Sequence, residues 1–168
     1  SNLGRMYRIK AYEIPEGSRT SKGMNIVNLL PLEPDEKVSA MIRVPKEETE
    51  DMYLCMFTRK GIIKRSALSE YKTIRKTGII AINLDEDDEL AWVKLTSGND
   101  DILVATKKGM CIRFNENDAR AIGRTARGVR AISLKEDDEV IGMDIINDES
   151  CILTVSETGY GRRSLGSD

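Results

Sequence analysis

The fold is decided by a four-residue stretch, Thr58-Arg59-Lys60-Gly61, which returns as Thr106-Lys107-Lys108-Gly109 and Ser156-Glu157-Thr158-Gly159. Ser1-Asn2-Leu3-Gly4 fits the same pattern, so the stretch recurs at intervals of roughly fifty residues. Self-similarity at a fixed period is the signature of a repeat architecture. We therefore predict units over residues 1–48, 49–98 and 99–147, and the start of another over residues 148–168.

Two further markers recur in the same order within each unit. A second glycine (Gly23, Gly78 or Gly128) precedes a short apolar run, and an acidic cluster such as Asp85 to Glu89 follows the run. The apolar runs are Ile26–Leu30, Ile79–Leu84 and Val129–Leu134. Three markers in one order are hard to obtain by chance, which supports the repeat.

Each unit is expected to contain four short strands. In the second unit these are Met52–Phe57, Ile62–Arg65, the run after Gly78, and Leu90–Leu95, with the glycine turn between the first two. Only residues 68–71 and 116–121 have weak helical character. Four strands per unit is typical of a β-propeller blade, and a solenoid or a stack of hairpins is the alternative. We assign these positions to the blade cores: Ile62, Ile80, Ile82, Leu90, Trp92, Leu103, Ile112, Ile132 and Ile141.

Composition excludes several classes of catalytic site. The 168 residues contain no histidine, which removes Ser-His-Asp and Cys-His machinery. The three cysteines are widely spaced, so we interpret Cys55, Cys111 and Cys151 as small core residues rather than metal ligands. The acidic cluster at Asp85 lacks the glycine and the distal glutamate of a calcium loop, and is interpreted as a turn. No apolar run approaches the length of a membrane span, so no membrane partner is expected and the chain is predicted to be intracellular.

Charge alternates with the period of the repeat although the formal net charge is only −2. Residues 59–83 hold seven bases and one acid, whereas residues 84–106 hold one base and seven acids. In a radial array one repeat position recurs around the ring, so the bases should form one band and the acids another. A basic band is the electrostatic footprint of a polyanion partner, and balanced, solvated turns are the alternative.

The partner predicted from this band is double-stranded DNA, held by its phosphates without reading of bases. A protein-interaction propeller is the other open class. With 5% aromatic residues, base-stacking platforms for single strands are not expected, and Trp92 is interpreted as a core residue. The candidate DNA-binding residues are Arg8, Lys10, Arg19, Lys22, Arg59, Lys60, Lys64, Arg65, Lys72, Arg75, Lys76, Lys107, Lys108, Arg113, Arg120, Arg124 and Arg127.

Several stretches resemble the C-terminal domain of the A chain of bacterial DNA gyrase. They are Gly4–Pro15, Ile26–Glu33, Leu95–Gly98 with Asp100-Asp101, Val129–Ile132, and Gly159–Arg163, and the resemblance covers essentially the whole chain. It implies a six-bladed β-pinwheel, a propeller whose neighbouring blades exchange strands, of which this chain would cover about three blades. The domain of that family wraps duplex DNA around a basic rim and so supports negative supercoiling by an ATP-dependent type II topoisomerase.

The resemblance also places the chemistry elsewhere. The family's catalytic tyrosine lies in the N-terminal part of the gyrase A protein, and ATP with Mg²⁺ binds in other parts of the enzyme. We therefore expect no catalytic residue, metal or cofactor in this chain. The expected partners are DNA, the remainder of the gyrase A protein and the gyrase B protein, in the bacterial cytoplasm at the nucleoid.

One departure from the family limits the analogy. The wrapping heptapeptide Q-R-R-G-G-K-G is absent, so the resemblance supports DNA binding but not DNA bending by this piece. The equivalent domain of topoisomerase IV is the nearest competing assignment.

The chain begins after the first strand of a unit, so we expect an interior slice of a longer propeller. Its exposed blade edges could pair two copies.

Overall fold

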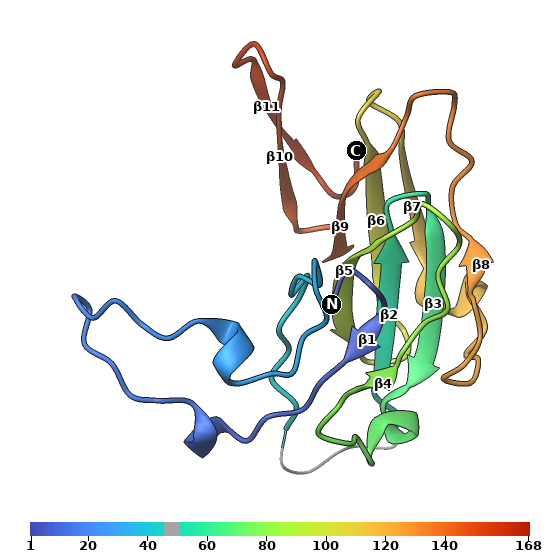
Figure 1. Cartoon of the computed structure of the whole chain (residues 1–168). Coiled ribbons are helices and arrows are strands. Elements are labelled where there is room, and N and C mark those ends of the chain that lie inside the picture. Colours follow the sequence, from blue (N-terminus) through green and yellow to red (C-terminus); the bar gives the residue numbers. More distant parts are fainter. Residues whose placement is uncertain (46–50) are drawn as a thin grey trace.

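The structure, a computed structural model, describes residues 1–45 and 51–168. The predicted boundary at residues 48 and 49 lies outside this range. The described residues form short strands and 3₁₀ helices (η), and no helix among them is long and apolar enough to cross a lipid bilayer. Figure 1 shows them in chain order: β1 (Arg5–Met6), η1 (Ala11–Glu13), η2 (Ile26–Asn28), β2 (Tyr53–Thr58), β3 (Ile62–Ala67), η3 (Leu68–Tyr71), β4 (Ile79–Ile80), β5 (Leu90–Thr96), β6 (Asp101–Thr106), β7 (Cys111–Asn115), η4 (Glu116–Asp118), β8 (Val129–Arg130), β9 (Val140–Ile146), β10 (Cys151–Val155) and β11 (Gly161–Leu165).

Three of the four recurring glycine stretches form the turn of a β-hairpin. The hairpins β2–β3, β6–β7 and β10–β11 are antiparallel. In the first of them the Thr58 hydroxyl accepts a hydrogen bond from the Ile62 amide at 3.1 Å, and Gly61 has a φ of 82°. Thr106 and Ser156 accept the same bond from Met110 and Tyr160, at 3.2 and 3.1 Å. The hydroxyl closes the turn and glycine supplies its positive φ, which explains why both residues recur.

The fourth strand of a unit pairs with the free side of its first strand. Thus β5 lies beside β2, and β9 lies beside β6. The second unit therefore forms the order β5-β2-β3, and the third unit forms β9-β6-β7. The turn before each fourth strand contains an aspartate with positive φ: Asp87 at 60° and Asp137 at 58°. The acidic clusters are turns, in line with their interpretation from the sequence.

The third strand of each unit pairs with the unit before it. The third unit's β8 joins β3 of the second unit, and the second unit's β4 joins β1 of the first. The exchange brings the Ile132 carbonyl so close to Gly61 that an added Cβ would lie 2.9 Å from it. The neighbouring blades therefore exchange strands, as the pinwheel prediction requires.

Two hydrophobic clusters lie on opposite faces of the second unit's sheet. Cys55, Phe57 and Ile63 face the third unit, where they join Ile102, Val104 and Val140. Leu54 and Met56 face the first unit and pack with Leu68, Ala81 and Ile82. Successive side chains of a strand point to opposite faces, and both faces of β2 are covered, so β2 has an uninterrupted apolar run from Leu54 to Phe57.

The predicted core positions are partly wrong because alternate residues were assigned to the wrong face. Ile82 and Leu90 are buried, and Trp92 and Ile132 pack against the cluster beside the third unit. Ile80, Ile112 and Ile141 are 49, 36 and 53% exposed, and Ile62 and Leu103 are half-buried. The neighbours Ile63, Ile102, Val104 and Val140 fill the core instead, as a shift of one residue on a strand requires.

Two other expectations from the sequence are corrected. Residues 26–28, expected to begin a strand, form the 3₁₀ helix η2. Cys55 is buried, but Cys111 and Cys151 are exposed on β7 and β10. The weakly helical segment at 68–71 is η3, and of the segment at 116–121 only residues 116–118 form a helix, η4.

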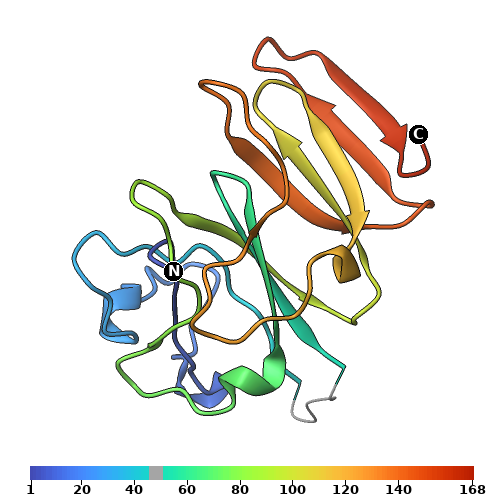
Figure 2. The same cartoon turned by 90° about the vertical axis from the view of Figure 1, so that its right-hand side faces the viewer.

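The segment between the second and third strands of a unit is called its connection. The first connection (residues 10–23) extends away from the sheets (Figure 1), whereas the second (68–78) and third (116–128) lie against the preceding unit (Figure 2). These connections carry most of the candidate DNA-binding residues, so their anchoring determines the shape of the basic surface.

Candidate nucleic-acid interface

The bases of the glycine turns are held by the acidic turns of the same unit. Arg59 pairs with Glu89 at 2.5 Å and lies 5.3 Å from the centre of the Trp92 ring. The backbone amide of Lys60 donates to Asp88, and its ammonium group donates to the Glu86 carbonyl.

The third unit repeats this arrangement. Lys107 pairs with Glu139 at 3.7 Å, and Lys108 donates to Asp138 through its backbone and to the Glu136 carbonyl through its side chain. The prediction that basic and acidic segments form separate bands is therefore wrong at the glycine turns. Four of the candidate bases already have local acidic or carbonyl partners there.

An arginine stands four residues after each turn glycine, and the arginines of the first three units reach into the following unit. Arg8 donates to the carbonyl of Lys72, which ends η3, and Arg65 lies 3.5 Å from the carbonyl of Ala119, which ends η4. Arg113 bonds Asp148 and the Gly166 carbonyl in the following unit. These three candidates therefore join successive units. The signal in the sequence was the recurrence of arginine at one repeat position.

Lys64 and Arg65 are not on the surface. Lys64 is fully buried and Arg65 is 5% exposed, so the expectation that they belong to an exposed rim is wrong. The Lys64 ammonium group donates to the carbonyls of Ala81 and Arg124. Burial, with the Arg124 charge nearby, lowers the pKa of Lys64 to about 8, against a smaller opposing effect of Glu70. Counting the charges in each sequence segment could not predict the burial of Lys64, because the count does not include the third connection that packs over β3.

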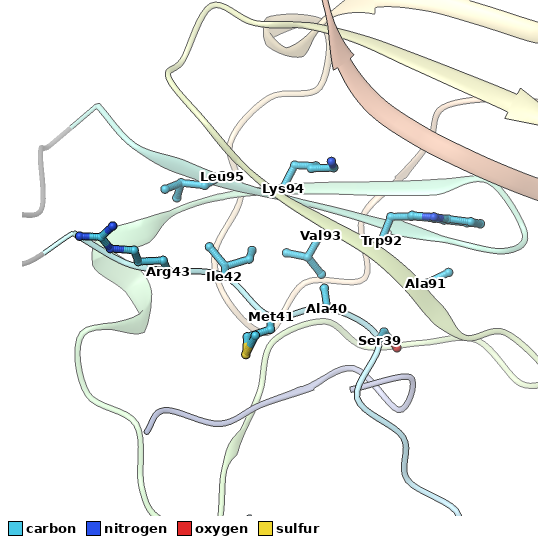
Figure 3. Close-up of a pocket in the computed structure, with 10 residues that line it drawn as sticks. All are labelled: Ser39, Ala40, Met41, Ile42, Arg43, Ala91, Trp92, Val93, Lys94 and Leu95. Carbon is cyan, nitrogen blue, oxygen red and sulfur yellow. The ribbon is translucent and has the colours of Figure 1, made fainter. Parts of the chain in front are cut away.

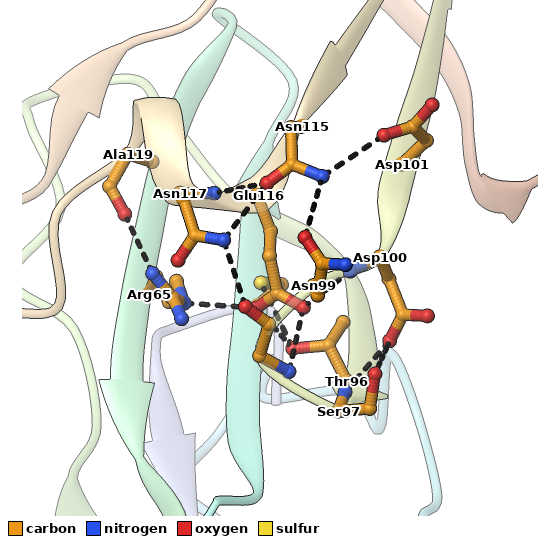
Figure 4. Close-up of polar contacts among 12 residues, drawn as sticks. Arg65, Thr96, Ser97, Asn99, Asp100, Asp101, Asn115, Glu116, Asn117 and Ala119 are labelled. Atoms are coloured by element: carbon orange, nitrogen blue, oxygen red, sulfur yellow. Dashed lines mark hydrogen bonds and ion pairs between the residues drawn. The ribbon is translucent and has the colours of Figure 1, made fainter.

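Arg65 belongs to a buried polar network around Glu116 (Figure 4). Its Nε lies 2.8 Å from Glu116 Oε2, and its guanidinium stacks 4.0 Å from the centre of the Tyr53 ring. The same carboxylate accepts hydrogen bonds from the Thr96 hydroxyl and from the amides of Gly98 and Asp100, at 2.7 to 2.9 Å. Glu116 was not among the residues singled out from the sequence.

The bases that remain exposed lie mainly on the connections. Lys72, Arg75 and Lys76 are exposed on the second connection, and Arg120 and Arg127 are exposed on the third. The third connection contacts the run that follows the second connection: the half-buried Arg124 donates to the Ile80 carbonyl of β4, and Asn83 donates to the Thr125 carbonyl. Figure 2 shows both connections on the same side of the sheets, the second in green and the third in orange.

Acidic partners are few on this surface. No described carboxylate pairs with Arg75, Lys76 or Arg120, whereas Arg127 pairs with Asp85. Lys10, Arg19 and Lys22 are exposed on the first connection. The structure adds Arg130, which is exposed on the exchanged strand β8 and lines a surface hollow of about 400 Å³ with Lys60 and Arg127. We define the connection surface as the exposed side of the second and third connections. Its bases are Lys72, Arg75, Lys76, Arg120, Arg124 and Arg127.

A second hollow, of about 480 Å³, lies between residues 39–43 and β5 (Figure 3). Its walls are mainly apolar, from Ala40, Met41, Ile42 and Val93, and its only bases are Arg43 and Lys94. Lys94 is paired with Asp144 at 2.7 Å. This hollow lacks the charge that a polyanion requires, so the connection surface is the better candidate interface.

Comparison with known proteins agrees with this architecture. The family model described as "DNA gyrase C-terminal domain, beta-propeller" matches residues 1–45, 53–97 and 100–147. The gyrase A protein of Staphylococcus epidermidis is 51% identical over 98% of this chain, which spans only 19% of that relative's length.

Two solved structures have the same fold over 99% of this chain. The C-terminal domain of DNA topoisomerase IV matches with a TM-score of 0.89 at 26% identity, over 52% of that chain. The DNA gyrase A C-terminal domain matches with a TM-score of 0.79 at 32% identity, over 53% of that chain. With the repeated hairpins and exchanged strands, these matches show that the chain belongs to the DNA gyrase C-terminal domain, beta-propeller family.

Proposed function

We propose that this chain binds duplex DNA through its connection surface. The observation that carries the proposal is the position of the exposed bases on two connections that lie on the same side of the sheets (Figure 2). The bases of the glycine turns and of strand β3 have partners within the protein, so we expect less from them than from Arg75, Lys76 and Arg120, which no described carboxylate pairs with. The proposed set is therefore narrower than the sequence alone suggested.

The proposed mode of binding is neutralisation of backbone phosphates. Arginine and lysine on irregular segments supply charge and release counterions, whereas base reading needs side chains inserted into a groove. A duplex that follows the curve of the propeller would also have to bend, at an energy that depends on the flexibility of its sequence. Since the wrapping heptapeptide is absent from this chain, we expect phosphate binding with less bending than a complete domain would give.

We further propose that the chain is the DNA-binding module of a gyrase-type topoisomerase. The 51% identity to a gyrase A protein supports gyrase over topoisomerase IV. The catalytic tyrosine and the ATP site would then lie in other parts of the enzyme. The remainder of the gyrase A protein and the gyrase B protein would be its protein partners.

The test is a salt titration of DNA binding. Fluorescence anisotropy would measure the affinity of the chain for two labelled duplexes of unrelated sequence between low and moderate salt. If about six phosphates are neutralised, the log–log slope should be about −5 for both duplexes. Absence of duplex binding at low salt would contradict the proposal and would leave a protein-interaction propeller as the better interpretation.

A further inference from the structure

Strand β3 holds the third connection with three consecutive residues. Lys64 donates to the Arg124 carbonyl, the Arg65 carbonyl accepts from the Ile122 amide at 2.9 Å, and the Ser66 hydroxyl donates to the Ile122 carbonyl at 2.8 Å. The backbones of Arg65 and Ala121 also form an isolated parallel bridge. The connection therefore lies along β3 as an irregular extra strand.

The start of the same connection is fixed by Glu116. This side chain is completely buried, and its two carboxylate oxygens meet Arg65, the Thr96 hydroxyl and two backbone amides. A buried carboxylate is tolerated only when it is paired and hydrogen-bonded, and both conditions hold here. Glu116 thus ties η4 at once to β3 and to the link between β5 and β6.

The chemistry of this contact demands one geometry. An apolar contact keeps much of its energy when two surfaces slide by a small distance, whereas the hydrogen bonds that Thr96, Gly98 and Asp100 donate to the Glu116 carboxylate weaken with small changes of distance and angle. Arg65 is additionally confined by the Tyr53 ring. A shift of the third connection would separate two buried charges, so the network selects one register of the connection on β3.

The bases affected by that register are in the connection surface. Arg120 lies between the anchored residues Glu116 and Ile122, and Arg124 and Arg127 follow shortly after. We propose that the buried pair Arg65–Glu116 is a positioning device that sets where Arg120, Arg124 and Arg127 meet DNA. This inference rests on the proposed function, and it gives Arg65 an indirect role in DNA binding instead of phosphate contact.

The experiment uses the full 168-residue chain and the charge-neutral double variant Arg65→Met/Glu116→Leu. Leucine is chosen because Leu68 occupies the equivalent place in the second unit, where it is buried. Removing both charges together avoids leaving one of them buried alone. Amide hydrogen exchange would report on the anchoring, and DNA affinity would report on the positioning.

In the unsubstituted chain, Arg120→Ala with Arg127→Ala should weaken duplex binding about fivefold or more. In the Arg65→Met/Glu116→Leu background the same two substitutions should change the affinity for the duplex less than about twofold, because Arg120 and Arg127 are then no longer held at fixed positions. Arg75→Ala with Lys76→Ala is the matched control: it lies on the second connection and should have equal effects in both backgrounds. Exchange of the Ile122 amide should accelerate in the double variant, while that of the β2 amides should not.

The outcomes separate the two proposals. Equal effects of Arg120→Ala and Arg127→Ala in both backgrounds, or unchanged exchange at Ile122, would overturn the positioning role while leaving DNA binding intact. Absence of duplex binding by the unsubstituted chain would instead overturn the proposed function, and the positioning role with it. Accelerated exchange at Ile122 in that case would still show that the pair anchors the connection.

Discussion

The first and second units meet through an apolar cluster, whereas the second and third add a buried ion pair to theirs. The two joints use equivalent residues. At the apolar joint, Arg8 is exposed and Leu68 is buried in the cluster with Leu54 and Met56. At the ion-pair joint, Arg65 and Glu116 are both buried. One backbone geometry therefore accepts either chemistry, and the difference lies in how strictly each joint fixes the connection that follows it.

The backbone around the two joints is the same. The amide of Leu68 donates to the Met52 carbonyl at 2.9 Å, and the amide of Glu116 donates to the Asp100 carbonyl at 2.8 Å. The 3₁₀ helices η3 and η4 start at these residues. The repeat thus fixes the path of the chain, and the side chain at one position decides whether the joint is apolar or ionic.

The largest effect is expected from breaking the ion-pair joint on one side. Glu116→Leu alone would leave the Arg65 guanidinium buried without its carboxylate, and should lower the free energy of unfolding by about 3 to 5 kcal/mol. Urea unfolding followed by circular dichroism would measure this. Glu70→Leu, at an exposed position on η3, is the control and should change stability by less than about 0.5 kcal/mol. A loss below about 1 kcal/mol for Glu116→Leu would show that the pair is not the main contact of the joint.

The apolar joint should respond to a change of volume rather than of charge. Leu68→Ala should lower the free energy of unfolding by about 2 to 4 kcal/mol, because the buried side chain leaves a cavity beside Tyr71 and Ala81. Leu68→Met keeps the volume and should cost less than about 1.5 kcal/mol in the same urea titration. Equal losses for the two variants would contradict a packing role for Leu68.

The buried Lys64 should make the contact between the second and third units depend on pH. Its pKa is lowered to about 8 by burial and by the Arg124 charge, against an ordinary value of 10.5. Between these two values the unfolded chain binds more protons at this residue than the folded chain, so its contribution to the free energy of unfolding rises with pH. The rise should be at most about 3 kcal/mol and should be flat below the folded pKa.

Lys64→Met provides the reference for this measurement, because other alkaline titrations cancel in the difference between the two proteins. The difference in unfolding free energy, wild type minus variant, should increase from about pH 8 to about pH 10.5. A difference that is constant or falls over this range would contradict a buried, charged Lys64.

The smallest effect concerns two glycines that share a conformation but not an environment. Gly61 and Gly109 have φ angles of 82° and 78°, so alanine at either should cost about 1 kcal/mol for the left-handed backbone. At Gly61 the new Cβ would also meet Ile132 at 2.9 Å, whereas at Gly109 nothing lies within 4 Å. Gly61→Ala should therefore lose about 1 kcal/mol or more beyond Gly109→Ala in thermal unfolding. Equal losses would argue against the exchanged strand over Gly61.

Much of the architecture could be predicted from the sequence because its signals are local. The glycine turns, the acidic turns and the fourth strands depend on residues close together in the chain, and the observed strands β5 and β9 lie where the apolar runs are. It was harder to predict which face of a strand is buried: Ile141 and Ile112 are exposed, whereas Val140 and Ile102 are buried. A near-continuous apolar run, such as Ile102–Val104 or Val140-Ile141, gives no alternation of apolar and polar residues from which to predict the buried face.

The burial of the candidate bases was predicted less well than the fold. Counting charge by segment grouped Lys64 and Arg65 with Arg75 and Lys76, although the first two are buried and the last two are exposed. The distinction arises from the third connection, which packs over β3 from far along the chain. One signal was present: an acid, Glu116, at the repeat position where the second unit has Leu68. When a repeat position is buried in one unit, an acid at the equivalent position of another unit indicates a buried basic partner.

The central claim is that exposed connection bases bind DNA while turn bases are engaged within the protein. The most direct test compares two triple variants that lose the same charge: Arg75→Ala/Lys76→Ala/Arg120→Ala on the connection surface, and Lys60→Ala/Lys107→Ala/Lys108→Ala at the glycine turns. The salt dependence of duplex binding should flatten by about 2 to 3 units of log–log slope for the first variant and change by less than about 1 for the second. Equal flattening, or greater flattening for the glycine-turn variant, would contradict the account.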